Sequence, residues 1–424
     1  MTAEITEKIK EFAEKGCCNW LFSANSAKPP RSLRLKAFAP ISAQVFLFQH
    51  AIHCYIDLSI MARSPAEKRS IRYRMPAEWE PHAATWLAWP HYKLDWPGKF
   101  EPIPWVFAEI IRYLSRDERV ELIVNDAAAE KSARKTLKLS HALNENIRFH
   151  RWPTDRIWTR DSGCAFVQPC GAGAPAPETS TMAAVKWKFN AWAKYPNWKR
   201  DEKIGSRMAE AAGANEIQAV YQKKRVVLEG GSIEVNGKGT LITTEECLLS
   251  RVQQRNPGMK KQDYEQIFAE YLGASNIIWL GSGIAGDDTH GHVDDITRFV
   301  SPDTVVTCVD ADPTGENYEA LRDNVRRLRD ATVENGKPLA TIDLPMPAPV
   351  YFEGRRLPAS YANFYIANRT VLVPVFNDPN DRVALDALAD IFPDRDVVGI
   401  YCGDLIWGFG AIHCMTQQQP SLTE

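Results

Sequence analysis

A recurring order of predicted elements constrains the fold of this chain more than any other feature. In its clearest form, an apolar strand at residues 226–235 leads through an Asn-Gly pair at 236–237 into a second strand at 240–244. Asn-Gly is a strong hairpin signal. Residues 262–272 then have the apolar spacing of a helix, and 276–280 form a short apolar run typical of a buried strand. The unit therefore has the order ββαβ.

Two downstream segments repeat this order with similar spacing, and two upstream segments repeat it less regularly. The downstream units cover residues 295–300, 304–309, 317–331 and 340–344, and then 361–367, 370–376, 381–391 and 396–400. The upstream units cover 85–89, 105–114 and 120–124, and then 147–152, 157–167 and 201–212. Strands that alternate with helices in this way indicate the α/β class.

Five units favour a five-bladed, pseudo-symmetric α/β propeller of ββαβ units over one open sheet. In a closed arrangement of repeats, the helices lie outside and the strand ends approach a common axis. The polar clusters of the sequence fall at strand ends or hairpin starts, one in each unit. A central active site requires that placement, so we expect residues 75–424 to form a single catalytic domain.

The first sixty residues do not follow this pattern. A semi-apolar run at 37–61 is long enough to cross a bilayer, but it contains Gln44, Gln49, His50, His53 and Asp57. Each of these is costly in hydrocarbon, so a transmembrane helix is not expected. The run also starts too late and is too polar for a signal peptide. We interpret residues 1–60 as a poorly ordered N-terminal extension or an upstream mis-start, with Met61 or Met75 as the functional start.

The composition of the whole chain is that of a soluble globular protein. The chain of 424 residues is 45% apolar and 25% charged, with a formal net charge of -2, which gives no support for binding nucleic acid. Nine cysteines without a C-x-x-C pair do not form a disulfide or zinc framework. Their scattered use predicts a reducing compartment, the cytoplasm. The sequence leaves a monomer and a homo-oligomer equally open.

Cys414 is the candidate nucleophile. It lies in a short apolar run, beside a histidine and a block of amides. A cysteine attacks only as its thiolate, and a free cysteine is mostly protonated at neutral pH. A neighbouring positive charge, from the substrate or from a histidine, can correct this. Cysteines in apolar runs are more often inert core residues, so Cys414 alone does not decide the function.

Carboxylates and a histidine in three upstream clusters complete the chemistry. His292 and Asp294 are two residues apart, so on a strand both point to the same face. A histidine there is suited to protonating a leaving amine and then activating water. Asp161 and Asp294 can bind the edges of a planar guanidinium. Glu229, at the start of a Glu-Gly-Gly turn, can hold the histidine charged, or can lie exposed in a simple bulge.

A metal site is the alternative interpretation of the same region. His290, His292 and Asp294 have ligand chemistry suitable for zinc, iron or manganese. Such a site predicts a metal-dependent hydrolase or an oxygenase, and it leaves Cys414 without a role. The carboxylate interpretation needs no metal. Both remain open on the spacing alone.

Seven motifs in order resemble the agmatine deiminase family, which also includes a bacterial peptidyl-arginine deiminase. They lie at residues 158–163, 189–192, 228–233, 244–249, 286–292, 359–368 and 412–420. The resemblance runs from about Met75 to Pro420, which is nearly all of the chain after the extension. It implies the five-bladed α/β propeller of the guanidino-group-modifying enzymes. It also implies hydrolysis of agmatine to N-carbamoylputrescine and ammonia, in putrescine biosynthesis, with peptidyl-arginine or another small guanidine as the alternative substrate.

The resemblance also implies roles for individual residues, without a metal or organic cofactor. Cys414 would attack the guanidinium carbon to form a covalent thiouronium intermediate, and His292 would protonate the departing ammonia. The implied substrate-binding residues are Asp161, Asp294, Trp158 and Asn363, with Glu229 supporting the histidine.

Three departures from the family pattern concern the far end of the substrate. Agmatine deiminases usually read Gly-Gly-Asn where Phe409, Gly410 and Ala411 stand, and Gly-Gly where residues 193–196 read Ala-Lys-Tyr-Pro. Cys164 replaces a usual proline. The reacting positions are unchanged, so we expect deimination more firmly than we expect agmatine.

Overall fold

The computed structural model describes residues 72–170 and 182–422, all within a unit that begins at Arg69. These residues form a mixed α/β fold with five sheets of three or four strands and two short two-stranded ladders. The α/β class expected from the sequence is therefore confirmed. The predicted extension, residues 1–60, lies outside the described residues. Among the described helices, none is both long enough and apolar enough to cross a membrane.

The clearest predicted unit is confirmed. β10 (Glu234–Val235) pairs antiparallel with β11 (Thr240–Thr244), which pairs in parallel with β12 (Asn276–Leu280). Between them lie α7 (Glu245–Leu249) and α8 (Lys261–Leu272). Asn236 makes the turn because its Oδ1 atom accepts the backbone N–H groups of the next residues, and Gly237 takes a φ of +70°. Glycine adopts this conformation without a steric penalty.

The two downstream units have the same topology. One contains β13 (Thr297–Ser301), β14 (Thr304–Val309), α9 (Tyr318–Arg329) and β15 (Ala340–Pro345). The other contains β18 (Tyr365–Ile366), β19 (Thr370–Val375), α10 (Asn380–Ile391) and β20 (Asp396–Tyr401). In each sheet the first pair is antiparallel and the second is parallel. The first strands are shorter than predicted, because their flanking residues leave the ladder and enter loops.

The first sheet corrects one prediction. Its strands are β21 (Gln417–Pro420), β2 (His82–Ala88), β3 (Arg119–Val124) and β4 (Ile147–Arg151), in that order. Residues 147–152 were assigned to the second unit, but β4 pairs in parallel with β3. Two helices make the crossovers, α3 (Ile103–Leu114) and α4 (Ala127–Leu139), and the second of these was not predicted. β21 brings the C-terminal segment back to the first sheet, where Gln417 pairs with Trp86.

The second unit forms the remaining sheet. It contains β5 (Ala165–Cys170), β6 (Ala183–Lys186), α6 (Ile204–Ala211) and β7 (Asn215–Gln218). β1 (Arg72–Arg74) pairs antiparallel with β5 on its other edge. The short ladders join β8 (Val220–Tyr221) to β9 (Lys224–Arg225) and β16 (Tyr351–Phe352) to β17 (Arg355–Arg356). α5 (Thr159–Ser162) precedes β5.

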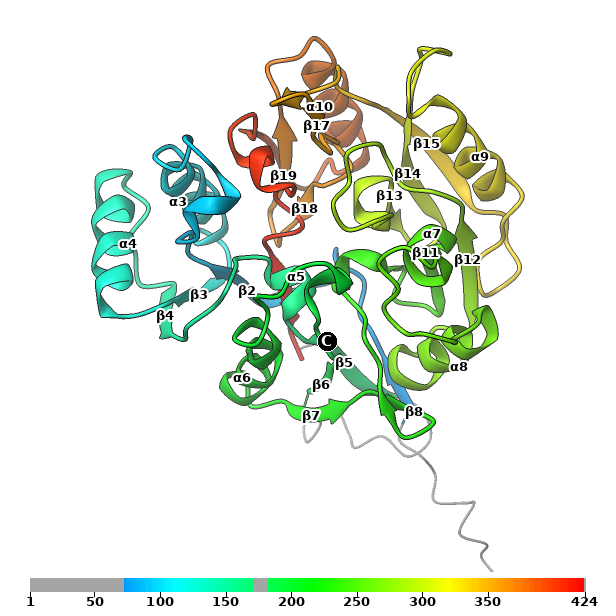
Figure 1. Ribbon diagram of the computed structural model, residues 1–424, viewed down its shortest axis with the longest axis horizontal. Helices are drawn as coiled ribbons and strands as arrows, with labels where there is room; N and C mark the ends of the chain where they lie inside the picture. The colour runs from blue at the N-terminus through cyan, green and yellow to red at the C-terminus, as the bar shows by residue number, and fades with distance from the viewer. Residues whose placement is uncertain (1–71, 171–181, 423–424) are drawn as a thin grey trace, which may run out of the picture. The chain divides into compact units, whose positions relative to one another are not determined.

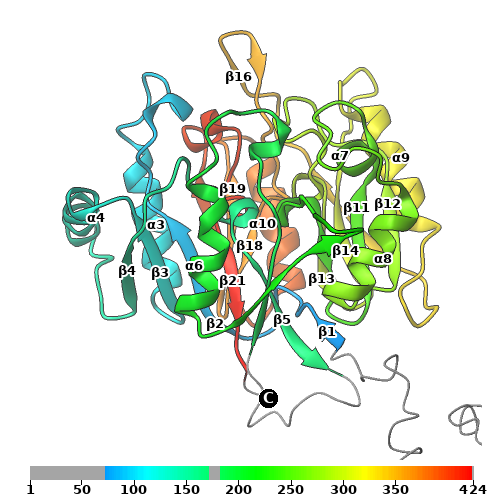
Figure 2. The ribbon, with the colours of Figure 1, turned by 60° about the horizontal axis from the view of Figure 1, so that its bottom comes forward.

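The longer helices lie at the outside of this unit, as Figure 1 shows for α4, α8, α9 and α10, whereas α5 lies near its middle. α9 illustrates the cause, since Leu321, Val325 and Leu328 are buried while the intervening Arg326 is exposed. Apolar residues at this spacing form one buried face of a helix. Figure 2 shows the β16 strand extending from the edge of the same unit.

The loops that open the five ββ pairs carry the predicted site residues. Asp161 precedes β5, Glu229 precedes β10, His292 and Asp294 precede β13, Asn363 precedes β18, and Cys414 precedes β21. The same position in each unit therefore contributes one part of a single cluster. This topology explains how residues far apart along the chain, such as Arg160 and His413 at 253 positions, come into contact.

Candidate active site

Cys414 lies at a cavity of about 140 Å³, and its residue surface is 6% exposed. Asp161, Trp158 and Trp192 also line this cavity. The Sγ atom lies 3.2 Å from the Nδ2 atom of Asn363 and 3.7 Å from an Oδ2 atom that belongs to Asp294. The nucleophile predicted from the sequence therefore reaches a cavity rather than an inert core.

The surroundings of the thiol oppose its ionisation. Burial raises the pKa of Cys414 well above its ordinary value, and the carboxylates of Asp294, Asp295 and Asp161 raise it further. The hydrogen bond from Asn363 acts in the opposite direction. A cation placed among these carboxylates would offset their charge, and it would make the thiolate more accessible.

Asp161 is held in place by two donors. The indole N–H of Trp192 donates to its Oδ2 atom over 2.8 Å, and the backbone N–H of Gly231 donates to Oδ1 over 3.0 Å. Burial raises the pKa of Asp161 to about 6, against the attraction of His292, and the charges of Asp294 and Glu229 raise it further. Burial and the neighbouring carboxylates thus oppose the ionisation of Asp161.

Asp294 offers an unused acceptor. Its Oδ1 atom is buried without a hydrogen-bond partner among the described residues, whereas Oδ2 contacts the Nδ1 atom of His413 over 2.7 Å. A buried carboxylate oxygen without a partner is energetically unfavourable unless a ligand completes it. Asp161 and Asp294 therefore have the chemistry to bind a planar, positively charged group.

His292 lies between two carboxylates and is fully buried. Its Nδ1 atom is 3.9 Å from the Oδ1 atom of Asp161, and its Nε2 atom is 3.6 Å from the Oε2 atom of Glu229. Burial opposes protonation, but Asp161, Cys247 and Glu229 together raise the pKa of His292 well above its ordinary value. The imidazole is therefore positively charged near neutral pH, as a general acid requires.

Glu229 keeps its charge through a cation that was not predicted. The Nε atom of Arg255 lies 3.2 Å from the Oε1 atom of Glu229, and both side chains are fully buried. Burial raises the pKa of Glu229, but Arg255 and His292 lower it below its ordinary value overall. Glu229 is thus a buried carboxylate at ion-pair distance from His292 rather than an exposed bulge residue.

His292 and Asp294 do not lie on a strand, the condition under which the sequence placed both side chains on one face. His292 is extended, with φ −61° and ψ 138°, and Val293–Asp295 form a turn of 3₁₀ helix. The two side chains nevertheless approach the same point. A Cβ atom added to Gly231 would lie 2.6 Å from the Nδ1 atom of His292, and 3.0 Å from carboxylate oxygens of Asp161 and Asp294. Because Gly231 has no side chain, His292, Asp161 and Asp294 can pack closely around its backbone.

The residues named for the metal alternative are not brought together. The Nε2 atom of His290 lies 3.1 Å from the hydroxyl of Ser250, and its Nδ1 atom lies 3.6 Å from a carboxylate oxygen of Glu246. In the described parts of the chain, the groups with metal-ligand spacing are Glu229–Cys247–His292 and Asp294–Asp295–Cys414. Neither contains His290, so the proposed set His290, His292 and Asp294 is not assembled.

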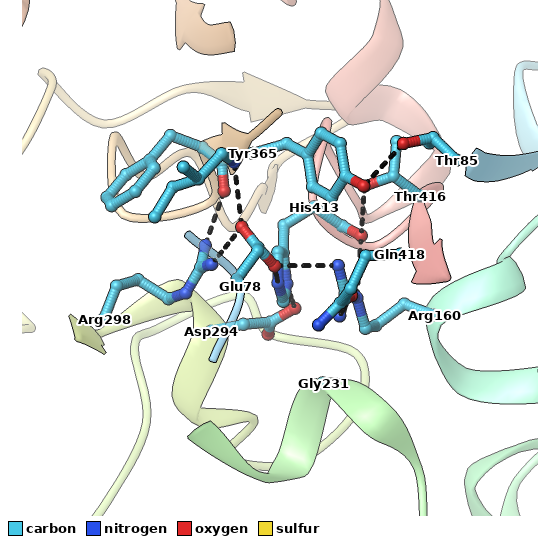
Figure 3. A network of polar contacts seen from close by, with 12 residues as sticks. Glu78, Thr85, Arg160, Gly231, Asp294, Arg298, Tyr365, His413, Thr416 and Gln418 are labelled. Atoms are coloured by element: carbon cyan, nitrogen blue, oxygen red, sulfur yellow. Dashed lines mark hydrogen bonds and ion pairs between the residues drawn. The ribbon is translucent and has the colours of Figure 1, made fainter. Parts of the chain in front are cut away.

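A buried ionic network behind the cavity was missed in the sequence (Figure 3). The Nε2 atom of His413 lies 2.8 Å from the Oε2 atom of Glu78, which also lies 3.0 Å from a guanidinium nitrogen of Arg160. The other oxygen of Glu78 accepts from Arg298 over 2.7 Å. Burial raises the pKa of Glu78, but Arg298, His413 and Arg160 bring it well below its ordinary value.

This network joins segments that are distant in the sequence, and it holds in place the segment that carries His413 and Cys414. Arg298 of β13 also binds Glu234 of β10 over 3.0 Å and donates to the carbonyl of Phe364, while Arg160 donates to Gln418 of β21 over 2.7 Å. His413 lies inside the last of the seven motifs and Glu78 lies near the start of the family resemblance, but the sequence gives no indication of a contact across 335 positions.

With this geometry established, the comparisons with known proteins decide the family. Residues 74–420 match the family described as Porphyromonas-type peptidyl-arginine deiminase. The chain belongs to this family. It is 34% identical over 384 residues to agmatine deiminase from Pseudomonas aeruginosa (strain LESB58), covering 85% of this chain and 99% of that protein. The protein is accordingly a hydrolase of the agmatine deiminase and peptidyl-arginine deiminase family.

Solved structures agree in fold with this family member. An agmatine deiminase of Enterococcus faecalis matches with a TM-score of 0.74 at 30% identity, covering 83% of this chain and 96% of that one. A cysteine-to-serine variant of C. jejuni agmatine deiminase with substrate bound matches with a TM-score of 0.71 at 27% identity, covering 82% and 96%. Their fold is the mixed α/β fold described above.

Proposed function

We propose that this family member is a guanidine deiminase that uses Cys414 as a covalent nucleophile. One observation carries the proposal. The thiol lies 3.7 Å from Asp294 at a cavity that Asp161 also lines, and His292 lies within 3.9 Å of Asp161. This arrangement has a nucleophile, a pair of carboxylates and a charged histidine around one small volume, as attack on a guanidinium requires.

Substrate binding would place a positive charge beside the thiol of Cys414. A guanidinium between Asp161 and Asp294 can donate to oxygens of both carboxylates, including the unpartnered Oδ1 atom of Asp294. Its positive charge would counter the carboxylates that keep Cys414 protonated. The substrate thus favours formation of its own nucleophile, and the thiol proton leaves to solvent before attack.

In the first half-reaction, the thiolate of Cys414 forms a bond to the guanidinium carbon. The resulting tetrahedral adduct is neutral at carbon and releases one of its nitrogens as ammonia. His292, which the geometry holds protonated, donates the required proton to that nitrogen. The product of this step is a covalent thiouronium cation on the enzyme.

In the second half-reaction, His292 acts as the base. It removes a proton from water as the oxygen attacks the thiouronium carbon. The C–S bond then breaks, the Cys414 thiolate leaves, and the hydroxyl proton passes to the released ammonia through solvent, which gives the uncharged ureido product and ammonium. Glu229, 3.6 Å from the imidazole, favours the return of the proton to His292. The net reaction consumes one water and yields one ammonium ion and one uncharged ureido group.

Agmatine is the reference substrate, with N-carbamoylputrescine as its product and putrescine biosynthesis as the pathway. The agmatine deiminases among the relatives support this choice. Peptidyl-arginine is the alternative, because the family description names it. We infer in addition that Trp158 and Asn363 form walls of the substrate site, since Trp158 lines the cavity and Asn363 contacts the thiol.

We also propose a closed five-bladed, pseudo-symmetric propeller, with residues 75–424 as one catalytic domain after an extension at 1–60. The shared strand order of the five sheets supports it, as does the contribution of every unit to one cluster. Free cysteines at six described positions support a reducing compartment, the cytoplasm.

The test is release of ammonia and ureido product from agmatine, L-arginine and a blocked arginine peptide. Cys414→Ala is expected to abolish release, whereas Cys170→Ala, at a half-buried cysteine outside the cavity, retains full activity. Mass spectrometry of the acid-quenched wild type should show the substrate-derived adduct on Cys414. Undiminished turnover by Cys414→Ala would refute the cysteine mechanism.

A further inference from the structure

Asp95 has an unused acceptor oxygen at the cavity. It ends the short 3₁₀ helix η2 (Lys93–Asp95), and it lines the same cavity as Cys414 and Asp161. The guanidinium of Arg156 binds its Oδ1 atom, whereas its Oδ2 atom is buried without a hydrogen-bond partner among the described residues. A buried carboxylate oxygen without a donor is energetically unfavourable, so this atom is a candidate acceptor for a ligand.

The carboxylate of Asp95 is charged and held in place. Burial raises its pKa to about 6, against the attraction of Arg156, and the charge of Asp288 raises it further. Asp95 is therefore mostly ionised at neutral pH. Because Arg156 occupies Oδ1, the side chain is fixed in the wall and its Oδ2 atom is left for another donor.

The other carboxylates of the cavity wall already have donors. The ammonium of Lys194 lies 2.5 Å from Oδ1 of Asp288, the hydroxyl of Tyr195 lies 2.5 Å from Oδ2, and the guanidinium of Arg355 also contacts Oδ1. Asp161 accepts two hydrogen bonds and is assigned to the guanidinium of the substrate. Beyond the guanidinium, the acceptor that the wall leaves unused is therefore the Oδ2 atom of Asp95.

The composition of the cavity wall suits an alkyl chain that ends in a cation. Five aromatic side chains line the cavity, namely Tyr92, Trp158, Trp192, Tyr195 and Phe409. Aromatic rings pack against methylene groups, and their faces attract cations. Among the lining residues, three aspartates carry carboxylates, and Arg156 is the only one with a cationic side chain.

One feature of Arg156 favours the opposite charge. Its Nε atom is also buried without a hydrogen-bond partner among the described residues. Its guanidinium, however, is paired with Asp95, and the guanidinium carbon lies 5.1 Å and 4.2 Å from the ring centroids of Tyr92 and Tyr195. A neutral acceptor such as water can satisfy the remaining N–H group, so Arg156 does not require an anionic ligand.

We propose that Asp95 receives the terminal ammonium of the substrate, so that this enzyme selects guanidines with a second cation at the other end of a short alkyl chain. The inference rests on the proposed deiminase function and specifies how its substrate is selected. The inner carboxylates bind the guanidinium, the aromatic wall packs against the methylene groups, and the ammonium donates to the Oδ2 atom of Asp95. Agmatine meets these requirements, whereas an arginine residue within a peptide has neutral amides in place of the ammonium.

Three guanidines with comparable chains test this selection. Agmatine ends in an ammonium, butylguanidine in a neutral methyl group and δ-guanidinovalerate in a carboxylate. For the wild type, we expect kcat/KM to be about 10- to 100-fold higher for agmatine than for butylguanidine, because a charge-assisted hydrogen bond is lost, and lowest for δ-guanidinovalerate. Equal values for agmatine and butylguanidine would overturn the inference. The highest value for δ-guanidinovalerate would also overturn it, and would assign the end of the chain to Arg156.

Asp95→Asn keeps the shape of the side chain and removes its charge. We expect kcat/KM for agmatine to fall by about 10- to 100-fold, while the value for butylguanidine changes little and so shows that the site is folded. Asp386→Asn is the matched control, because the side chain of Asp386 is 55% exposed on α10 and pairs with Arg382. Loss of the agmatine preference in Asp288→Asn rather than in Asp95→Asn would contradict the inference.

Calorimetric binding to Cys414→Ala separates this inference from the deiminase mechanism, because it measures the selection of the chain end without turnover. Tighter binding of agmatine than of butylguanidine, lost when Asp95→Asn is added, supports the inference even if the wild type releases no ammonia. Equal binding of the two ligands, together with release of ammonia by the wild type, would overturn the inference and leave the deiminase function intact.

Discussion

The side-chain amide of Asn363 donates to the Sγ atom of Cys414 over 3.2 Å, and the same nitrogen lies 3.0 Å from a carboxylate oxygen of Asp295. Its Oδ1 atom accepts the backbone N–H of His413 over 3.0 Å. Asn363 thus supplies a donor to the thiol and fixes the turn that carries it. It is the neighbour that lowers the pKa of Cys414 against burial and three carboxylates.

Asn363→Asp is expected to make the thiol less reactive. The new carboxylate would accept rather than donate, so the pKa of Cys414 should rise further, and the pH profile of iodoacetamide alkylation should move to higher pH. A hydrogen bond to a charged group contributes about 1.5–3 kcal/mol, so kcat/KM should fall by about 10- to 100-fold. Asn363→Ala, which only removes the donor, should give a smaller shift. An unchanged alkylation profile in both variants would exclude this role.

Asp161→Asn should stabilise the protein while it abolishes activity. Burial raises the folded-state pKa of Asp161 from 3.8 to about 6, so the ionised carboxylate costs about 3 kcal/mol of stability above that pH. Below the unfolded-state pKa both states are protonated and the cost disappears. We expect a higher urea midpoint for the variant at about pH 8 and equal midpoints at about pH 3.5. In the wild type, kcat/KM should decline as the pH falls below about 6, as Asp161 becomes protonated. A less stable variant at high pH would contradict this assignment.

Gly231→Ala probes the spacing of the charged cluster. The added Cβ atom would lie 2.6 Å from the Nδ1 atom of His292 and 3.0 Å from oxygens of Asp161 and Asp294, so these side chains must move apart. Misplacement of reacting groups by about 1 Å can cost about 100-fold in rate, and we expect a loss of that size in kcat. Gly336→Ala is the control, because it meets nothing within 4 Å and carries only the strain of its φ of +80°. Wild-type kcat in Gly231→Ala would show that the cluster tolerates expansion.

Local patterns predicted much of this molecule. The Asn-Gly hairpin at 236–237 is fixed by the side chain and backbone of its own residues, so sequence was sufficient. The placement of β4 was not predictable in this way, because its parallel pairing with β3 depends on the intervening α4 and on packing far along the chain. Parallel pairing joins strands through long crossovers and leaves no signal at a turn.

The same distinction applies to the site. The groups of the charged cluster each carry recognisable chemistry, and Cys414, His292, Asp294, Asp161 and Glu229 were all predicted from their motifs. Their supporting partners were not. Arg255 beside Glu229 and His413 beside Asp294 are buried polar residues whose function depends on contacts between different units. Contacts of this kind between units leave no periodic pattern in the sequence from which they could be predicted.

Arg298→Met is expected to be the most destabilising of these changes. The guanidinium of Arg298 is fully buried, where it binds Glu78 over 2.7 Å and Glu234 over 3.0 Å. Removing one partner of a buried ionic network leaves the others uncompensated, at a cost of about 3–5 kcal/mol in the free energy of unfolding. Arg326→Met is the control, because the side chain of Arg326 is 71% exposed in its ion pair, and it should cost less than about 1 kcal/mol.

The pH dependence of the Arg298→Met effect gives a second measurement. In the wild type the pKa of Glu78 is held well below its ordinary value, so this contribution is present above the unfolded-state value of 4.5 and is lost as the pH falls through the lower folded-state value. Arg298→Met removes the main cause of that depression, so the urea midpoints of variant and wild type should converge as the pH falls through this range. A constant difference between the two proteins across pH would show that Arg298 stabilises the fold through packing rather than through its charge.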